Sequence, residues 1–187
     1  WLFSSSPAAW GKFAPMLTRK APALPAPAKV LLTGFDAFGG ESLNPSWLAV
    51  KALHGRKIVG HTVVAAQLPT VFDDSLRELD ALLQKHQPAL VICVGQAGGR
   101  NALSLERVAI NVNDARITDN AANQPIDTPV ISGGPAAYFT TLPIKAMLAA
   151  LRQEEIAVEV SQTAGTFVCN HVFYGLMHAL ATKRKLR

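Results

Sequence analysis

The sequence contains only two cysteines among its 187 residues. A pair in a chain of this length does not indicate a disulfide framework, and reduced thiols in a cytoplasmic protein are the simpler interpretation. No apolar run reaches the roughly 18 residues that a membrane-spanning helix needs, so we expect no membrane partner. With 49% hydrophobic and 17% charged residues, the composition is that of a folded protein, and the length suits one α/β domain.

Acidic residues are missing from both ends of the chain. Residues 1–28 contain Lys12, Arg19 and Lys20 but no acid, and residues 183–187 contain four basic residues and no acid. The formal net charge is +5, so the segment between these ends has a net charge of −2. Because the basic character belongs to the ends and not to the domain, we expect no nucleic-acid partner.

Residues 1–28 also differ from the rest in composition. The stretch Ala21–Ala28 reads A-P-A-L-P-A-P-A, which is typical of a linker. A secretory signal fits poorly, since no basic region precedes a clean apolar stretch. We therefore interpret 1–28 as an N-terminal extension or added linker, and 29–187 as an α/β domain.

Strand and helix patterns alternate from Lys29 onward, and no internal repeat is visible. Apolar and β-branched runs predict strands at 29–34, 58–68, 89–95, 103–112 and 157–161. Helical patterns start at the Asn44-Pro45 cap, at Phe72, at Ile144 and after Thr166, and residues 113–135 are expected to form a long polar loop.

This alternation predicts a three-layer α/β/α sandwich with a mostly parallel central sheet. The run Ala89–Gly95 (A-L-V-I-C-V-G) is continuously apolar, which is typical of a strand buried on both faces. The last predicted helix leads into Lys-Arg-Lys-Leu-Arg, where such a fold normally continues into a strand. We therefore expect the chain to be incomplete at its C-terminus and to lack the fold's final strand and helix.

Cys169 lies in a setting that suits a nucleophile. The segment Val158–Cys169 reads as a strand, a turn of small residues and a helix start. With Thr166 as the N-cap, Cys169 falls in the first helical turn, where unpaired N–H groups and the helix dipole favour a thiolate. A buried structural cysteine remains the alternative. Cys93 lies inside an apolar run, where packing is the better interpretation.

A cysteine nucleophile needs a base, and the sequence offers no convincing one. Its five histidines are His54, His61, His86, His171 and His178. The first three are expected at helix ends or on an exposed strand. His171 is two residues from Cys169 and points elsewhere on a helix, and His178 is more than two turns away.

Other chemistry has little support in the sequence. Glu106, taken alone, fits a surface carboxylate that pairs with a neighbour. The loop Gly95–Arg100 follows a predicted strand, but its spacing is not G-x-G-x-x-G, which argues against a nucleotide-binding domain. No His, Cys, Asp and Glu grouping has metal-ligand spacing, and we expect no cofactor.

Three segments together resemble the pyroglutamyl-peptidase I (pyrrolidone-carboxylate peptidase) family of cysteine peptidases. They are T-G-F-D-A-F-G-G-E-S-L-N-P-S (Thr33–Ser46), G-Q-A-G-G-R-N-A-L-S-L-E-R-V-A-I-N (Gly95–Asn111) and V-S-Q-T-A-G-T-F-V-C-N (Val160–Asn170). The resemblance covers about residues 29–182. It implies a Cys-His-Glu triad in which Cys169 is the nucleophile and Glu106 the acid. The family's histidine lies in an F-I-H segment after the cysteine helix, and the sequence contains no such segment.

The family removes N-terminal pyroglutamyl (5-oxoprolyl) residues from peptides without a cofactor, is usually cytoplasmic and often forms homo-tetramers. A pocket for this small lactam needs aromatic walls and a few polar groups. The resemblance implies that Phe35 and Phe38 are an aromatic clamp and that Phe167 and Val168 present backbone groups to the lactam. The other implied pocket or supporting residues are Asn44, Thr70, Gln96, Arg116 and Ile117. A catalytically inactive relative that acts as a binding or assembly module is the alternative function.

Overall fold

The computed structural model describes residues 28–182. The predicted N-terminal extension, apart from Ala28, and the basic segment 183–187 lie outside the described residues. Four helices are present in the described part: α1 (Pro45–Lys51), α2 (Phe72–His86), α3 (Ile144–Gln153) and α4 (Val168–Thr182). The strands are β1 (Lys29–Phe35), β2 (Lys57–Ile58), β3 (His61–Leu68), β4 (Leu90–Cys93), β5 (Leu103–Glu106), β6 (Val108–Ile110), β7 (Ala137–Phe139) and β8 (Val158–Ser161).

The largest sheet has the strand order β2-β3-β1-β4. Strand β1 lies in the middle and pairs in parallel with β3 and with β4, whereas the short β2 is antiparallel. The predicted mostly parallel sheet is therefore confirmed. Because β1 and β4 are parallel, the residues that follow Phe35 and Cys93 emerge at the same edge, where ligands bind in open α/β sheets.

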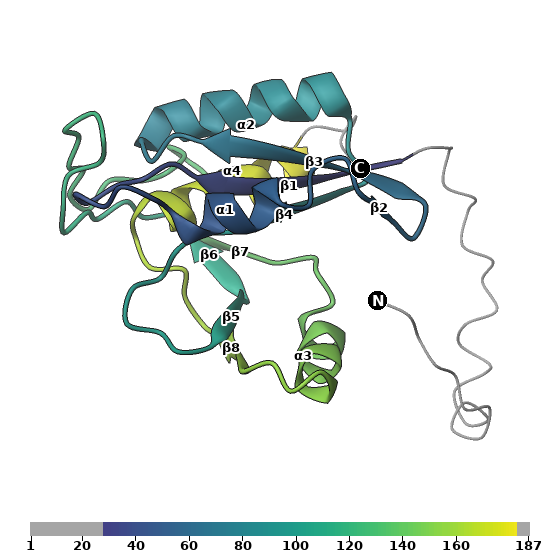
Figure 1. Cartoon of the computed structure of the whole chain (residues 1–187). Coiled ribbons are helices and arrows are strands. Elements are labelled where there is room, and N and C mark those ends of the chain that lie inside the picture. Colours follow the sequence, from purple (N-terminus) through teal and green to yellow (C-terminus); the bar gives the residue numbers. More distant parts are fainter. Residues whose placement is uncertain (1–27, 183–187) are drawn as a thin grey trace.

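Helices cover both faces of this sheet, as expected for a three-layer sandwich (Figure 1). On one face, Leu31 and Leu68 pack with apolar residues of α2 and α4. On the other face, Leu32 and Val63 pack against Val50 of α1. The alternation of Leu31 and Leu32 between the two cores follows from the period of two in a strand. Helix α4, which carries Cys169, is thus held by the larger core.

Two predicted strands are divided in the structure. Residues 58–68 form a hairpin because Val59 and Gly60 both have positive φ angles, of 49° and 78°, which turn the chain back on itself. Residues 103–112 are interrupted at Arg107. The N–H of Arg107 donates to the carbonyl of Ser161, the last residue of β8, at 3.0 Å, and its carbonyl accepts from the N–H of Thr140 after β7 at 2.9 Å. The chain changes partners at this residue, so β5 pairs with β8 and β6 with β7.

The prediction that the 89–95 segment is buried on both faces was wrong. Strand β4 is at the edge of its sheet, Leu90 is 39% exposed, and the other strand residues are only half-buried. An apolar run alone does not indicate how many neighbours a strand has. The 113–135 segment is a long loop, as predicted, with a single bridge between Asn113 and Thr128.

Buried His171 predicts a pH-dependent stability. Its side chain is 1% exposed, and burial lowers its pKa to about 4, although the charge of Asp73 acts in the opposite direction. In the unfolded chain the pKa is about 6.5. Between pH 6.5 and 4 the unfolded chain therefore binds the extra proton, and the free energy of unfolding falls as the pH falls, by about 3 kcal/mol at most from this group.

We expect His171→Gln, whose amide can still donate to Asn113, to unfold with a weaker pH dependence than the parent between pH 6.5 and 4. Denaturant titrations at several pH values measure this. His86, whose pKa burial also lowers, is present in both proteins and cancels in the difference. Parallel pH curves for the two proteins would show that His171 does not carry the effect.

Candidate active site

Cys169 is the second residue of α4. The first helical hydrogen bond runs from the N–H of His171 to the carbonyl of Phe167 at 3.1 Å, so Phe167 occupies the N-cap position. The prediction that Thr166 is the N-cap was wrong, because its hydroxyl donates to the carbonyl of Asp114 at 2.7 Å. Cys169 nevertheless lies in the first turn, as predicted, where backbone N–H groups have no carbonyl partner inside the helix.

The side chain of Asn170 anchors this first turn. It is fully buried, accepts from the N–H of Ile110 at 3.0 Å and donates to the carbonyls of Ile110 at 2.9 Å and Val112 at 3.0 Å. Val168 and Val172 on either side are also buried in the larger core. The backbone that carries Cys169 is therefore fixed against β6.

The environment of the Cys169 thiol opposes ionisation. Burial, followed by the charge of Glu106, raises its pKa to about 11, and the nearby Arg100 only partly offsets this. Burial of the thiol therefore acts against ionisation, in the opposite direction to the effect expected of the helix N-terminus. Burial likewise raises the pKa of Cys93 to about 11, and Cys93 packs against the core.

Glu106 ends β5 and is near enough to Cys169 to influence its ionisation. Its Oε1 accepts from the Nη1 of Arg100 at 2.8 Å. Its Oε2 is buried and accepts no hydrogen bond from the described residues. One carboxylate oxygen is thus held in place, while the other is available to a further donor. Such an unpaired buried oxygen normally has a functional reason.

None of the chain's five histidines is hydrogen-bonded to Cys169 or Glu106 among residues 28–182. His54 accepts from the N–H of Ala65, and His61 bonds to Val59. His171 bonds to Asn113, and His178 to Tyr138. His86 lies near Lys29, at the start of β1 and far from the edge where that strand ends.

Phenylalanine rings from separate segments gather near the thiol. The ring centroids of Phe38 and Phe167 are 6.2 Å apart, and those of Phe72 and Phe167 are 5.4 Å apart with an edge-to-face orientation. Phe35 is 3% exposed and packs in the same core as Cys169. Phe72 was missed by the sequence reasoning because it could only be recognised as the first apolar residue of a helix.

Asp36 connects the predicted supporting residues and was also missed. Its carboxylate accepts from the N–H of Thr70 at 2.7 Å, and its carbonyl accepts from the side chain of Asn44 at 2.8 Å. Asn44 also caps α1 by accepting from the N–H of Ser46, as predicted. Asp36 lies within the F-D-A-F segment of the family resemblance, and this position is the sequence signal from which its role could have been predicted.

The remaining predicted residues lie on two loops. Gln96 follows β4 and is half-buried, and its Oε1 is buried without a hydrogen-bond donor among the described residues. Arg116 and Ile117 are exposed on the long loop. Buried Asp119 organises this loop. Although burial disfavours its charge, hydrogen bonds from Asn123 and from backbone N–H groups keep its pKa below the usual value.

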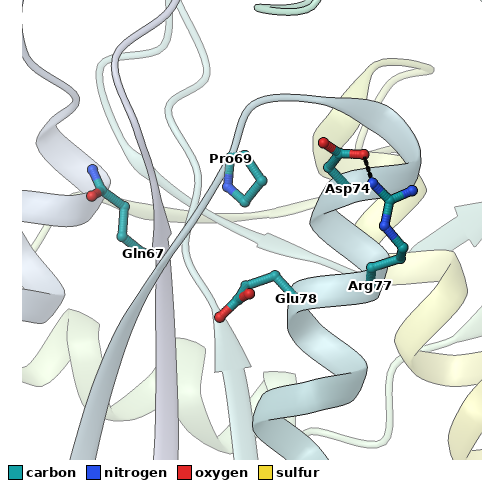
Figure 2. Close-up of a pocket in the computed structure, with 5 residues that line it drawn as sticks. All are labelled: Gln67, Pro69, Asp74, Arg77 and Glu78. Carbon is teal, nitrogen blue, oxygen red and sulfur yellow. Dashed lines mark hydrogen bonds and ion pairs between the residues drawn. The ribbon is translucent and has the colours of Figure 1, made fainter.

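Two cavities lie beside the predicted site rather than in it. Figure 2 shows one of about 430 Å³ between the end of β3 and the first turns of α2, where Asp74 and Arg77 form an ion pair. It is lined by Gln67, Pro69, Asp74, Arg77 and Glu78. The other, of about 640 Å³, lies between the start of α2 and the long loop. No predicted site residue lines either cavity.

Residues 28–182 contain neither a metal site nor a membrane-spanning helix. No three His, Cys, Asp or Glu side chains in this part of the chain are grouped so that they could hold a metal ion. No helix in it has both the length and the apolar character needed to cross a bilayer.

Comparisons with known proteins identify the family. The sequence model of the family described as "Pyroglutamyl peptidase" matches residues 28–186. The chain belongs to the pyroglutamyl peptidase family. The match extends over the whole described part, and it confirms the resemblance carried by the three segments.

Curated and solved relatives agree with this assignment. The chain is 63% identical over 152 residues to "Pyrrolidone-carboxylate peptidase 1" of Ralstonia nicotianae, with 81% of this chain and 71% of that protein covered. It is 59% identical to the "Pyrrolidone-carboxylate peptidase" of Bacillus cytotoxicus, with 83% and 73% covered.

A crystal structure of Bacillus amyloliquefaciens pyroglutamyl peptidase I superposes with a TM-score of 0.83 at 55% identity, covering 85% of this chain and 77% of that one. The pyrrolidone carboxyl peptidase of Pyrococcus furiosus gives 0.81 at 44% identity, with 83% and 74% covered. The predicted α/β fold is therefore confirmed by solved structures as well as by topology.

The raised pKa of Cys169 predicts how the rate at which its thiol is alkylated depends on pH. We expect alkylation by iodoacetamide to accelerate about tenfold per pH unit from pH 7 to 10, because only the thiolate reacts. Mass-spectrometric peptide mapping separates Cys169 from Cys93. Glu106→Gln removes a charge that raises this pKa, so we expect faster alkylation of Cys169 at pH 8.5.

Glu159→Gln is the matched control, because Glu159 lies on β8 and accepts from Ser104 instead. We expect it to react like the parent chain. A plateau in the parent's rate below pH 8 would contradict this prediction, since it would mean that the thiol is already ionised.

Proposed function

We propose that this protein is a cysteine peptidase that removes N-terminal pyroglutamyl residues from peptides, with Cys169 as nucleophile and Glu106 as the orienting acid. The observation that carries the proposal is the meeting of Cys169 and Glu106, from two segments 63 residues apart, in a member of the pyroglutamyl peptidase family. The surrounding phenylalanines suit a substrate whose first ring is small and uncharged.

Recognition of the lactam requires a hydrogen-bond acceptor, a donor and an apolar surface. Gln96 offers a buried Oε1 without a donor, which suits the lactam N–H. Backbone groups of Phe167 and Val168, at the start of α4, face the lactam in this proposal, while Phe35 and Phe38 enclose the ring. Asn44, Thr70, Arg116 and Ile117 act as supports or as the outer wall.

The reaction is an acyl transfer to sulfur followed by hydrolysis. Cys169 loses its proton, and the sulfur bonds to the pyroglutamyl carbonyl carbon. The C–N bond to the next residue then breaks, and the leaving amine takes up a proton. Backbone N–H groups in the first turn of α4 stabilise the oxyanion. Water then attacks the thioester, which releases pyroglutamate and restores the thiol.

A thiol with a pKa of about 11 needs a base to accept its proton at neutral pH. The family resemblance assigns this step to a histidine in an F-I-H segment, and the unpaired Oε2 of Glu106 suits an acceptor for the N–H of such a histidine. The sequence contains no F-I-H segment. The alternative function is that of an inactive relative that acts as a binding or assembly module.

Hydrolysis of pyroglutamyl-aminomethylcoumarin tests the proposal. We expect turnover by the chain extended with the C-terminal F-I-H segment of a relative. Turnover by the parent chain should be slower by about 10² to 10⁴-fold, since general acid–base catalysis contributes that much.

Two controls accompany this assay. Prolyl-aminomethylcoumarin lacks the lactam carbonyl and carries a charged amine, so the extended chain should leave it intact. Cys169→Ala in the extended chain should abolish turnover. If the extended chain binds the pyroglutamyl amide without cleaving it, the binding-module alternative is correct.

The family resemblance also supports finer proposals about context. We propose that residues 29–187 belong to one pyroglutamyl-peptidase-like α/β domain, that the protein works in the cytoplasm, that it assembles as a homo-tetramer and that it needs no cofactor. Light scattering coupled to size-exclusion chromatography measures the assembly directly, and a monomeric mass would reject it.

A further inference from the structure

Gly95 lies directly against the thiol of Cys169. A Cβ atom built on Gly95 would lie 2.7 Å from the Sγ of Cys169 and 3.6 Å from the ring of Phe35. Carbon and sulfur atoms in ordinary contact are about 3.5–4 Å apart or more. The sulfur therefore fills the space that any other residue at position 95 would use for its side chain.

The need for glycine here does not come from the backbone. Gly95 is not among the residues with positive φ, whereas Gly99 in the same loop has a φ of 77°. An alanine at position 95 would thus meet no conformational strain of its own. The close approach of the sulfur is the only reason, in the described structure, for a glycine at this position.

Both sides of this contact are held in place. The N–H of Val94 donates to the carbonyl of Thr33 at 2.8 Å, which extends the pairing of β4 with β1 up to Gly95. On the other side, the three hydrogen bonds of Asn170 fix the first turn of α4. An added methyl group can therefore be accommodated chiefly by rotation of the Cys169 side chain, and few rotamers are open to it in a helix.

We infer that Gly95 is a positioning residue that sets the rotamer of the Cys169 thiol and thereby the direction of nucleophilic attack. This role rests on the proposed function of Cys169 as the nucleophile. Gly95 itself is exposed, so the sulfur lies beside an open surface from which a substrate can approach. A displacement of the sulfur by about 1 Å is enough to lower an enzyme's turnover about 10²-fold.

A double-mutant cycle on thermal stability tests the contact without any substrate. We expect Gly95→Ala to lower the melting temperature of the parent chain by several degrees and to have little effect in a Cys169→Ala background, where the sulfur is gone. Gly98→Ala is the matched control, because a Cβ there meets nothing within 4 Å and its φ is not positive. Equal shifts of Gly95→Ala in both backgrounds would overturn the inference.

The pH profile of Cys169 alkylation provides a readout that a purely structural role would not change. Burial is the largest cause of the raised pKa of this thiol, and the space beside Gly95 and Phe35 contributes to that burial. We expect Gly95→Ala to move the profile to lower pH, whereas Gly98→Ala keeps the parent profile. Identical profiles for all three proteins would refute a positioning role.

Activity assays, combined with the stability cycle and the alkylation profile, separate the positioning role of Gly95 from the proposed peptidase function. In the extended chain, Gly95→Ala should reduce kcat about 10²-fold with little change in KM, because the pocket residues are untouched. If no pyroglutamyl amide is cleaved by any chain, the proposed function fails, while the stability cycle and the alkylation profile still decide whether Gly95 positions the sulfur.

Discussion

The buried amide of Asn170 is the contact on which the site depends. It makes three hydrogen bonds to the backbone of Ile110 and Val112, and a buried amide without such partners would be costly. Because these residues belong to or follow β6, which continues from the strand that ends in Glu106, the same contact fixes Cys169 relative to Glu106. The relative position of the nucleophile and the acid is thus set by one neutral side chain, that of Asn170, and not by a direct interaction between Cys169 and Glu106.

The enclosure that orients the thiol also weakens it as a nucleophile at rest. Packing among Phe35, Gly95 and the larger core desolvates the sulfur, and the carboxylate of Glu106 adds a like charge to that of the thiolate. Together they outweigh the opposing charge of Arg100 and raise the pKa of the thiol to about 11. Such a site holds its reactive atom in a defined place and depends on a base to ionise it.

Local signals predicted the elements well. The Asn44-Pro45 cap, the helical spacing after Phe72 and the turn before Cys169 depend on neighbours a few residues away, so the sequence was sufficient for them. The errors came from partners that are distant in the chain. A local sequence pattern does not indicate the edge position of β4 or the change of strand partner at Arg107. Nor does it indicate the hydrogen bond from Thr166 to Asp114, which are 52 residues apart.

The sequence alone determined the family, the four helices and the position of Cys169 in a first helical turn, because each depends on short contiguous segments, but it did not predict β7. Only the tertiary structure determined the raised pKa of the Cys169 thiol, the unpaired Oε2 of Glu106, the linking role of Asp36 and the close contact between Gly95 and Cys169. These contacts join segments that are separate in the sequence, such as those of Asp36 and Thr70, 34 residues apart, and those of Gly95 and Cys169, and they exist only once the chain has folded.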